Sequence, residues 1–172
     1  MKTPLLAAAL AFGLALPAAS AHAQSPDHSA HTMATAAGGP APNAQEISGA
    51  EALLVAYRDA LTARDAKAMT DLFAQDSAIF ENGKAEGSFA NYMEHHLGPE
   101  LAEIASFTFG RPTVTVTTMG RMAYGRETYT YRIELSDGRV IDREGAATSV
   151  LMQDDGGWKI VQYHSSSRAP RK

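Results

Sequence analysis

The chain of 172 residues contains no cysteine. Disulfide-stapled scaffolds, thiolate metal sites and thiol catalysis all need that residue, so none of them applies here. Apolar residues make up 45% of the chain, which allows a domain of this length to fold on its hydrophobic core alone. The composition therefore predicts one globular domain of ordinary size, held together by packing.

Basic runs are also absent. The chain has 15 Lys and Arg against 19 Asp and Glu, which gives a formal net charge of −4 at pH 7. A domain that binds nucleic acid carries clustered positive charge to match the phosphates, and this sequence has no such cluster. We expect no nucleic-acid partner.

Long apolar runs are lacking except at the N-terminus. There a short basic start, Met1-Lys2, precedes an apolar run from Leu5 to Leu16 and the small-residue pattern Ala21-His22-Ala23. This order is typical of a secretory signal peptide, and the run is too short for a membrane-spanning helix. The sequence therefore predicts a signal peptide over residues 1–23, a mature start at Gln24, and a periplasmic or secreted product without membrane insertion.

Residues 24–45 are rich in Ala, Gly, Pro, Ser and Thr and have no apolar periodicity, which predicts a disordered linker. The segment contains His28, His31 and Met33, and imidazole and thioether groups are both ligands of copper. The alternative is a polar linker that carries two histidines by chance. A flexible tail fixes no coordination geometry, which favours this second interpretation.

Two helices are expected at the start of the folded part. Residues 48–51 fit a capping box, and a helix over about residues 49–64 is predicted. Its apolar stripe at helical spacing consists of Leu53, Leu54, Tyr57 and Leu61. Asp65 can cap a second, shorter helix. A short strand over 78–81 then ends at the turn signal Asn82-Gly83.

A third helix is predicted after Ser88, which can serve as its N-cap. Its apolar face follows the i, i+3, i+4, i+7 and i+8 pattern and consists of Phe89, Tyr92, Met93, His96 and Leu97. His95 falls about 100° away around the helix, on the polar side. His96 should therefore point inward, and Gly98-Pro99 should end or kink the helix.

The pattern changes from helical to alternating after Ser106. Strands are expected over residues 113–118, 121–135, 140–152 and 157–168, joined by short turns such as Asp137-Gly138. Four long strands in this order form an antiparallel meander. Because the helices precede the strands, the fold class is α+β, with helices packed on one face of a curved sheet.

The last strand carries the only tryptophan of the chain, Trp158. Its large apolar surface should face the core. Period-2 alternation without a bulge then places His164 on the same inner face. The sequence therefore predicts a histidine at the interior end of a core strand.

Three segments resemble the nuclear transport factor 2-like superfamily, which includes ketosteroid isomerases and SnoaL-like polyketide cyclases. They are Glu51-Ala52-Leu53-Leu54 with Tyr57, Asp71-Leu72-Phe73-Ala74-Gln75-Asp76-Ser77-Ala78, and Gly157-Trp158-Lys159-Ile160-Val161 followed by Tyr163-His164-Ser165-Ser166. The resemblance covers residues 46–168 and leaves 169–172 as a tail. It implies a cone, with a strongly bent sheet around the first helix, a pocket at one end and a homodimer through the outer sheet face. Activities differ widely within this fold, so the resemblance does not fix one.

The residues expected to face the pocket are His96, Tyr92 and His164, with Glu81 and Glu86 near them in sequence. One mechanism uses a neutral histidine as general base, with Tyr92 or a protonated carboxyl group donating to an oxyanion. The other uses His96, His164 and either Glu81 or Glu86 as ligands of a divalent metal such as zinc.

Each of these residues also has a structural interpretation. His96 can be a hydrogen-bonded interior histidine, His164 can cap the end of the cone, and Glu81 can be an exposed carboxylate beside a turn. The tyrosines expected at the sheet surface are Tyr124, Tyr129 and Tyr131.

Three classes of function follow. The first is an exported cone that binds a small hydrophobic ligand, with acid–base chemistry of the isomerase, dehydratase or cyclase kind if it is an enzyme. The others are a copper- or zinc-binding protein and a dimeric assembly module without catalysis. The first is favoured, because the polar groups at the pocket end exceed what a filled core requires.

Overall fold

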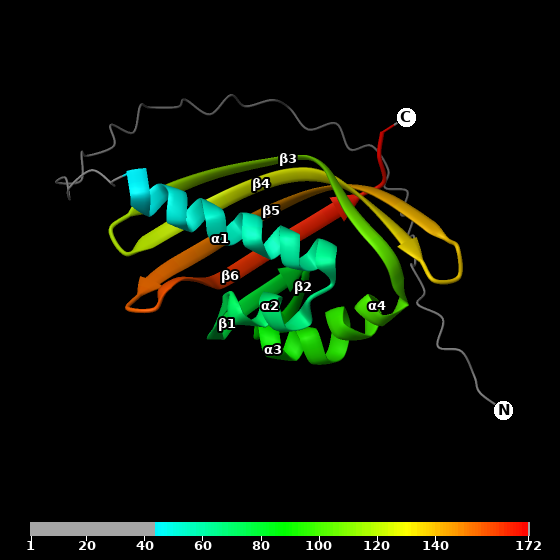
Figure 1. The fold of residues 1–172 in the computed structure, drawn as a ribbon, viewed down its shortest axis with the longest axis horizontal. Coiled ribbons are helices and arrows are strands. Elements are labelled where there is room, and N and C mark those ends of the chain that lie inside the picture. Colours follow the sequence, from blue (N-terminus) through cyan, green and yellow to red (C-terminus); the bar gives the residue numbers. More distant parts are fainter. Residues whose placement is uncertain (1–43, 172) are drawn as a thin grey trace, which may run out of the picture. The chain divides into compact units, whose positions relative to one another are not determined.

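The structure is a computed structural model that describes residues 44–171 (Figure 1). The predicted signal peptide and the tail residues His28, His31 and Met33 lie outside the described residues. In the part described, no helix has the length and apolar character needed to cross a membrane.

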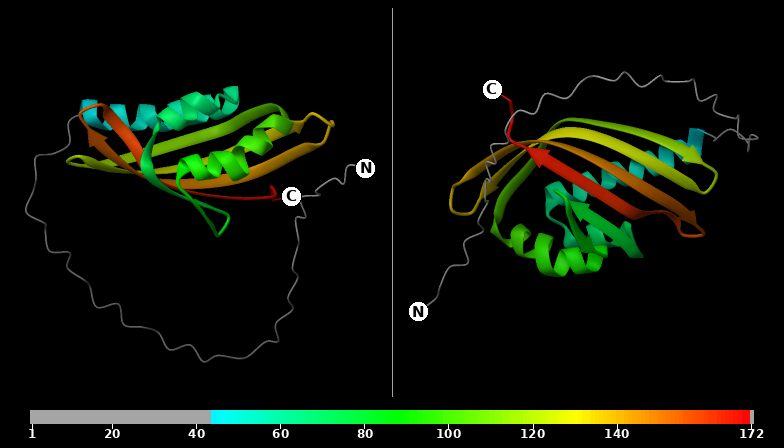
Figure 2. Two further views of the ribbon diagram at one scale, coloured as in Figure 1. Left: turned by 90° about the horizontal axis from the view of Figure 1, so that it is seen from below. Right: turned by 180° about the vertical axis from the view of Figure 1, so that it is seen from behind.

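In chain order the elements are α1 (Ala44–Ala63), α2 (Ala66–Asp71), β1 (Phe73–Glu81), β2 (Lys84–Gly87), α3 (Phe89–Tyr92), η1 (Met93–Leu97), α4 (Gly98–Glu103), β3 (Ile104–Met119), β4 (Met122–Leu135), β5 (Val140–Asp154) and β6 (Gly157–Arg168). The α+β class predicted from the sequence is confirmed. Its helices lie on one side of the curved sheet, as Figure 2 shows.

Helix α1 begins at Ala44, ahead of the predicted start. The predicted capping box at Ser48 is therefore wrong, because Ser48 lies inside the helix, and the predicted linker loses its last two residues to α1. Ala, Gln and Glu are strong helix formers, which accounts for the earlier start. The predicted cap of α2 is confirmed, since the Asp65 carboxylate accepts a hydrogen bond of 2.9 Å from the Ala68 amide.

The six strands form one sheet in the order β2-β1-β6-β5-β4-β3. Strands β3 to β6 make the predicted antiparallel meander, whereas β1 pairs with β6 in parallel. The first and last long strands of the fold therefore lie side by side. This pairing brings the end of β1 next to the serines that close β6.

The strands bend at bulges, where one strand has an extra residue and the local twist increases. In β3 the register shifts between Gly110 and Thr113, and Arg111 there adopts a φ of 50°. In β6 the extra residue is Val161, because Val150 pairs with Gln162 and Leu151 pairs with Ile160.

The bulge at Val161 reverses the alternation of β6. Trp158 and Ile160 are buried, the former as predicted, but beyond the bulge Tyr163 is the inward residue, and His164 is exposed on the outer face. The predicted inward position of His164 is therefore wrong. Its ring lies edge-on to that of Phe80, with centroids 6.2 Å apart.

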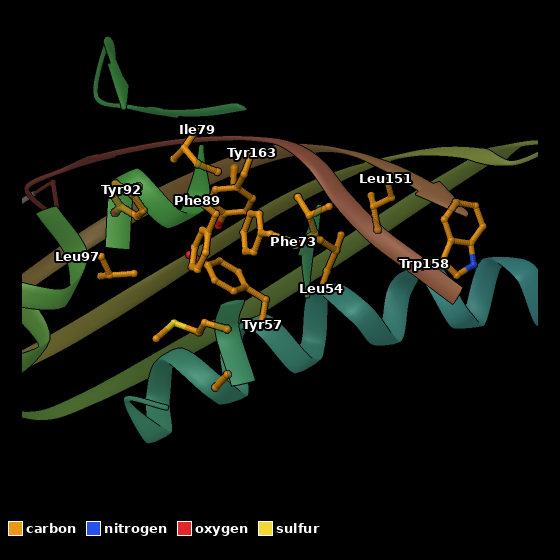
Figure 3. Packing of buried hydrophobic residues seen from close by; sticks show 14 of the residues in the cluster. Leu54, Tyr57, Phe73, Ile79, Phe89, Tyr92, Leu97, Leu151, Trp158 and Tyr163 are labelled. Carbon is orange, nitrogen blue, oxygen red and sulfur yellow. The ribbon is translucent and has the colours of Figure 1, made fainter. Parts of the chain in front are cut away.

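An aromatic cluster forms the core between α1 and the sheet (Figure 3). Phe73 and Phe89 stack with ring centroids 3.8 Å apart. The Tyr57 ring from α1 meets Phe73 edge-on at 5.2 Å and Tyr163 at 5.1 Å. Aromatic pairs at such distances add to the stabilisation from area burial alone. Tyr57 and Tyr163 of this cluster also line the cavity described next.

Candidate functional site

A cavity of about 110 Å³ lies between the helices and the inner face of the sheet. Five tyrosines line it: Tyr57, Tyr92, Tyr129, Tyr131 and Tyr163. Its charged groups are Glu81, Glu100 and Arg58, and apolar side chains such as Phe107 complete the wall. Apolar cavities of roughly 150 Å³ hold benzene, so a cavity of this size suits a small molecule.

Glu81 is the last residue of β1 and precedes the turn to β2. Asn82 and Gly83 in that turn have φ values of 48° and 86°, as a tight hairpin of the type preferred by Asn-Gly requires. The Glu81 side chain is 26% exposed, and it accepts a hydrogen bond of 2.7 Å from the Tyr92 hydroxyl. Glu81 is therefore a cavity carboxylate and not merely a surface residue of the turn.

Tyr92 and His96 share one face of the helical segment that follows Ser88. The Ser88 hydroxyl caps this segment by accepting from the Asn91 amide at 3.2 Å. The rings of Tyr92 and His96 are 5.1 Å apart, and His95 points to solvent. The predicted inward face of this helix is confirmed.

Gly98 and Pro99 do not end the helix, which continues to Glu103. A π turn over η1 precedes them instead, and the Gly98 amide donates to the Met93 carbonyl. A Cβ on Gly98 would lie only 2.4 Å from that oxygen, so glycine is required here. Single π turns are frequent at functional sites, and this one carries His96.

Three carboxylates surround the His96 imidazole. Its Nδ1 lies 3.1 Å from Glu86 Oε1, and its Nε2 lies 3.3 Å from Glu100 Oε1 and 3.8 Å from Glu81 Oε2. Both ring nitrogens of His96 thus face carboxylate oxygens. His96 therefore links a buried carboxylate to the two that line the cavity.

The acidic groups differ in their protonation. Burial raises the pKa of Glu100 above its usual range and outweighs the effect of His96. Burial acts in the same direction on Glu86, but hydrogen bonds from Lys84 and His96 bring its pKa below the usual value. Burial, with Tyr57 and Glu81 nearby, raises the pKa of Tyr92. Tyr92 therefore keeps its proton and acts as a donor.

A second charged pair lies on the inner face of the sheet. Arg58 Nη1 donates to Glu127 Oε2 at 2.7 Å, and the Glu127 side chain is only 1% exposed. Burial raises the pKa of Glu127 to about 7, although Arg58 opposes this shift. Glu127 Oε1 has no hydrogen-bond partner among residues 44–171. Arg58 also lines the cavity and brings a positive charge to it.

The family model of the SnoaL-like domain matches residues 50–170 of the chain. The chain belongs to the SnoaL-like domain family. No curated protein matches the chain.

Several solved structures share the fold of this SnoaL-like domain. A candidate ketosteroid isomerase from Shewanella frigidimarina is 27% identical, with a TM-score of 0.61, over 70% of this chain and 97% of that protein. A candidate dehydratase of the NTF2-like family from Streptomyces avermitilis is 17% identical, with a TM-score of 0.64, over 73% and 99%. A candidate scytalone dehydratase from Novosphingobium aromaticivorans is 14% identical, with a TM-score of 0.62, over 72% and 85%.

The SnoaL-like domain brings together four of the residues singled out from the sequence, namely Tyr92, His96, Glu81 and Glu86. His164 lies on the opposite face of the sheet, so the proposed ligand set of His96, His164, Glu81 and Glu86 is not assembled. No group of three His, Cys, Asp or Glu residues within 44–171 has the arrangement of a metal site. Glu86 faces Nδ1 of the His96 ring, whereas Glu81 faces Nε2. The two carboxylates therefore lie at different edges of the ring and are not arranged as ligands of one metal ion.

Sequence reasoning missed Glu100, Arg58 and Glu127. Glu100 could have been found, because it lies four residues after His96 on the same helical face. The prediction that Tyr129 and Tyr131 lie at the sheet surface is wrong, since both line the cavity, whereas Tyr124 is exposed as expected. The inward positions of β4 continue from the buried Ala123 at period 2, which is the signal that identifies them.

Proposed function

We propose that this SnoaL-like domain binds a small molecule in the cavity and moves protons on it by general acid–base catalysis, as an isomerase or a dehydratase does. The observation that carries the proposal is the meeting of Glu81, Glu100 and the Tyr92 hydroxyl at one cavity wall, with His96 between the two carboxylates. A filled core would not place two carboxylates and five phenols around one cavity.

The two cavity carboxylates divide the acid and base roles. Glu81 acts as the base, and the hydrogen bond from Tyr92 orients its carboxylate. Glu100 has a raised pKa and acts as the acid, with His96 beside it.

In the isomerisation, Glu81 takes a proton from a carbon next to a carbonyl group, and the electron pair of the C–H bond forms an enolate. Phenolic hydroxyl groups donate to the enolate oxygen, and Tyr129 is placed for this role at the cavity wall, whereas the Tyr131 hydroxyl donates to Ser167 Oγ. The proton then returns to another carbon. In a dehydration, Glu81 again removes the proton, the electron pair of the enolate forms a C=C bond as the neighbouring C–O bond breaks, and the protonated Glu100 carboxyl gives its proton to the departing hydroxyl, which leaves as water.

Arg58 defines the preferred ligand further. Its guanidinium donates to Glu127 through Nη1 only, and it faces the cavity. Guanidinium groups hold carboxylate and carbonyl oxygens in a fixed geometry. We expect a small carbonyl compound whose oxygen or carboxylate lies against Arg58. The likeness to proteins described as isomerase and dehydratase candidates supports this reaction class.

Deuterium exchange tests the proposal without knowledge of the natural substrate. Pyruvate, levulinate and cyclohexenone are incubated with the protein in D₂O, and loss of the carbon-bound proton is followed by NMR. We expect exchange with at least one probe, and Glu81→Gln should lower its rate by about 100-fold or more. His164→Ala serves as the control, because this residue lies on the other face. Equal rates in wild type and Glu81→Gln, or no exchange with any probe, contradict the proposal.

We also propose that the chain is exported and forms a homodimer through the outer sheet face. A groove of about 580 Å³ crosses that face and contains Arg111, Thr128, Glu144 and Arg168. Arg168 Nη2 lies 2.6 Å from Glu144 Oε2, so both signs of charge are present for pairing about a two-fold axis. Light scattering at micromolar concentration should give twice the monomer mass. A monomer that persists there contradicts this contact.

A further inference from the structure

Three methionines lie in a row across one end of the outer sheet face. Met119 at the end of β3 pairs with Met122 at the start of β4, and Met122 pairs with Met152 of β5. Directly paired residues of an antiparallel ladder place their side chains on the same face. Ala123 and Leu151, one residue further on, are buried, so the methionines point outward.

The three side chains are unusually exposed for apolar residues, at 57% for Met119, 40% for Met122 and 42% for Met152. The three methionines do not belong to the hydrophobic cluster between the helices and the sheet. Exposed single apolar residues are ordinary, but a contiguous set of one type calls for a reason. Core packing therefore does not account for these methionines.

The backbone beneath the row is fixed by hydrogen bonds. A two-residue turn, Gly120-Arg121, joins β3 to β4, and Gly120 has a φ of 61°. The Gln153 amide donates to the Arg121 carbonyl at 2.8 Å, and Arg121 Nε donates to the Gln153 carbonyl at 2.9 Å. The β3–β4 turn is thus tied to β5 next to Met152. The β3–β4 and β5–β6 turns lie at the same end of the sheet in Figure 1 and Figure 2.

Spacing and side-chain length allow the three sulfur atoms to meet. Neighbouring strands are about 4.8 Å apart, so Met119 and Met152 flank Met122 at roughly that distance on either side. Methionine has three rotatable bonds and adapts its sulfur position readily. The outer two side chains can therefore lean over Met122 and surround a single ion.

Thioether sulfur is a neutral, soft and polarisable ligand. It selects Cu(I) over hard cations such as Mg²⁺ and Ca²⁺, which prefer oxygen. Two basic groups lie beside the row. Arg121 in the β3–β4 turn donates from Nε to the Gln153 carbonyl, and Lys159, the β6 partner of Met152, donates from Nζ to the Asp71 carbonyl. The ammonium group is therefore held by the backbone of another element.

We propose that Met119, Met122 and Met152 form a surface site for a soft monovalent cation, Cu(I) or its redox-inert analogue Ag(I). The site lies on the opposite face of the sheet from Glu81 and His96, and it is independent of the proposed acid–base chemistry. It also lies six residues along β4 from Thr128, the nearest residue of that strand in the outer groove, or about 20 Å at 3.4 Å per residue. The cation site and the proposed dimer contact thus occupy different ends of the outer face.

Titration with Ag(I) in chloride-free buffer tests the site, with calorimetry and the NMR signals of the methionine methyl groups as readouts. The protein carries His28→Ala, His31→Ala and Met33→Leu, so that the tail cannot supply ligands. We expect one equivalent of Ag(I) to bind and to shift three methionine methyl signals. Met119→Leu, Met122→Leu and Met152→Leu should each weaken binding by at least 10-fold, and the triple variant should abolish it. Met93→Leu is the matched control, because Met93 packs against the core, and it should bind as before.

Two results overturn the proposal. In the first, Ag(I) binding survives in the triple leucine variant or is absent from the protein with the altered tail. In the second, Met119→Ser with Met122→Ser and Met152→Ser changes the mass in light scattering without metal, which identifies the row as a contact between copies. Melting curves confirm that each variant folds, and exposed positions should change Tm little.

Discussion

The Tyr92 hydroxyl lies 2.7 Å from Glu81 Oε2, joining a helix to the last residue of β1 across one wall of the cavity. Burial, together with the nearby Tyr57 and Glu81, raises the pKa of Tyr92, so this phenol donates and Glu81 accepts. The pair sits where a ligand would contact both groups. A change in either one should therefore alter the other.

Tyr92→Phe removes the donor and keeps the ring that packs against His96 and Phe89. Glu81 then loses its phenolic partner, and we expect proton exchange on the carbonyl probes to fall by about 10-fold, with a stability loss of about 1 kcal/mol. NMR exchange rates and thermal melts measure the two effects. Tyr124→Phe, on the exposed face, is the control and should change neither. An unaltered exchange rate in Tyr92→Phe would remove the pair from the mechanism.

Glu127 gives the fold a specific dependence on pH. Its pKa rises from the ordinary 4.5 to about 7 on folding, so the folded state binds more protons than the unfolded state between these values. Its contribution to the free energy of unfolding is therefore fully present below pH 4.5 and is lost as the pH rises through 7. Urea unfolding at several pH values should show a shallower decline for Glu127→Gln than for wild type. Glu94→Gln, at an exposed position, should follow wild type. Parallel profiles for wild type and Glu127→Gln contradict the assignment.

Gly98→Ala places a Cβ 2.4 Å from the Met93 carbonyl oxygen, which belongs to the backbone of the π turn and cannot move freely. We expect a stability loss of roughly 1–3 kcal/mol and a displaced His96. Urea unfolding and the chemical shifts of the His96 ring report these changes. Gly156→Ala meets only the Asp154 side chain, at 3.2 Å, and serves as a milder control. Equal stability of the two variants would contradict the steric argument.

The N-terminus of the exported protein is predicted to be Gln24, from the basic start, the apolar run and the Ala21-His22-Ala23 pattern. Intact mass of material from the periplasm or the medium should give the chain that starts at Gln24. Recovery of the full-length chain in the cytoplasm alone contradicts export.

The sequence predicted the helical half of the site well, because helical periodicity is local. Spacing from Phe89 places Tyr92 and His96 on one inward face, as the structure confirms. The prediction for the strand residues of the site was wrong because of a single residue. One extra residue, Val161, reverses every later side chain of β6, and it carries no signal of its own in sequence.

The buried charges were missed for a different reason. Arg58 follows Tyr57 on α1 and looks like a solvent-facing residue, and Glu127 lies in a strand rich in charged and hydroxyl side chains. Their partnership joins positions 69 residues apart, so no local pattern reveals it. The two residues meet only because the sheet curves around α1, and this contact can be identified from the structure alone.

The parallel pairing of β1 with β6 has a consequence for how the protein is made. The Ser167 amide donates to Asn82 Oδ1 at 3.0 Å, and these residues are 85 positions apart. Glu81 pairs with Ser165 of the last strand, and the serines that close β6 line the cavity beside it. A nascent chain without β6 therefore has an incomplete cavity wall, and we expect the proposed acid–base chemistry to begin only after the last strand has docked.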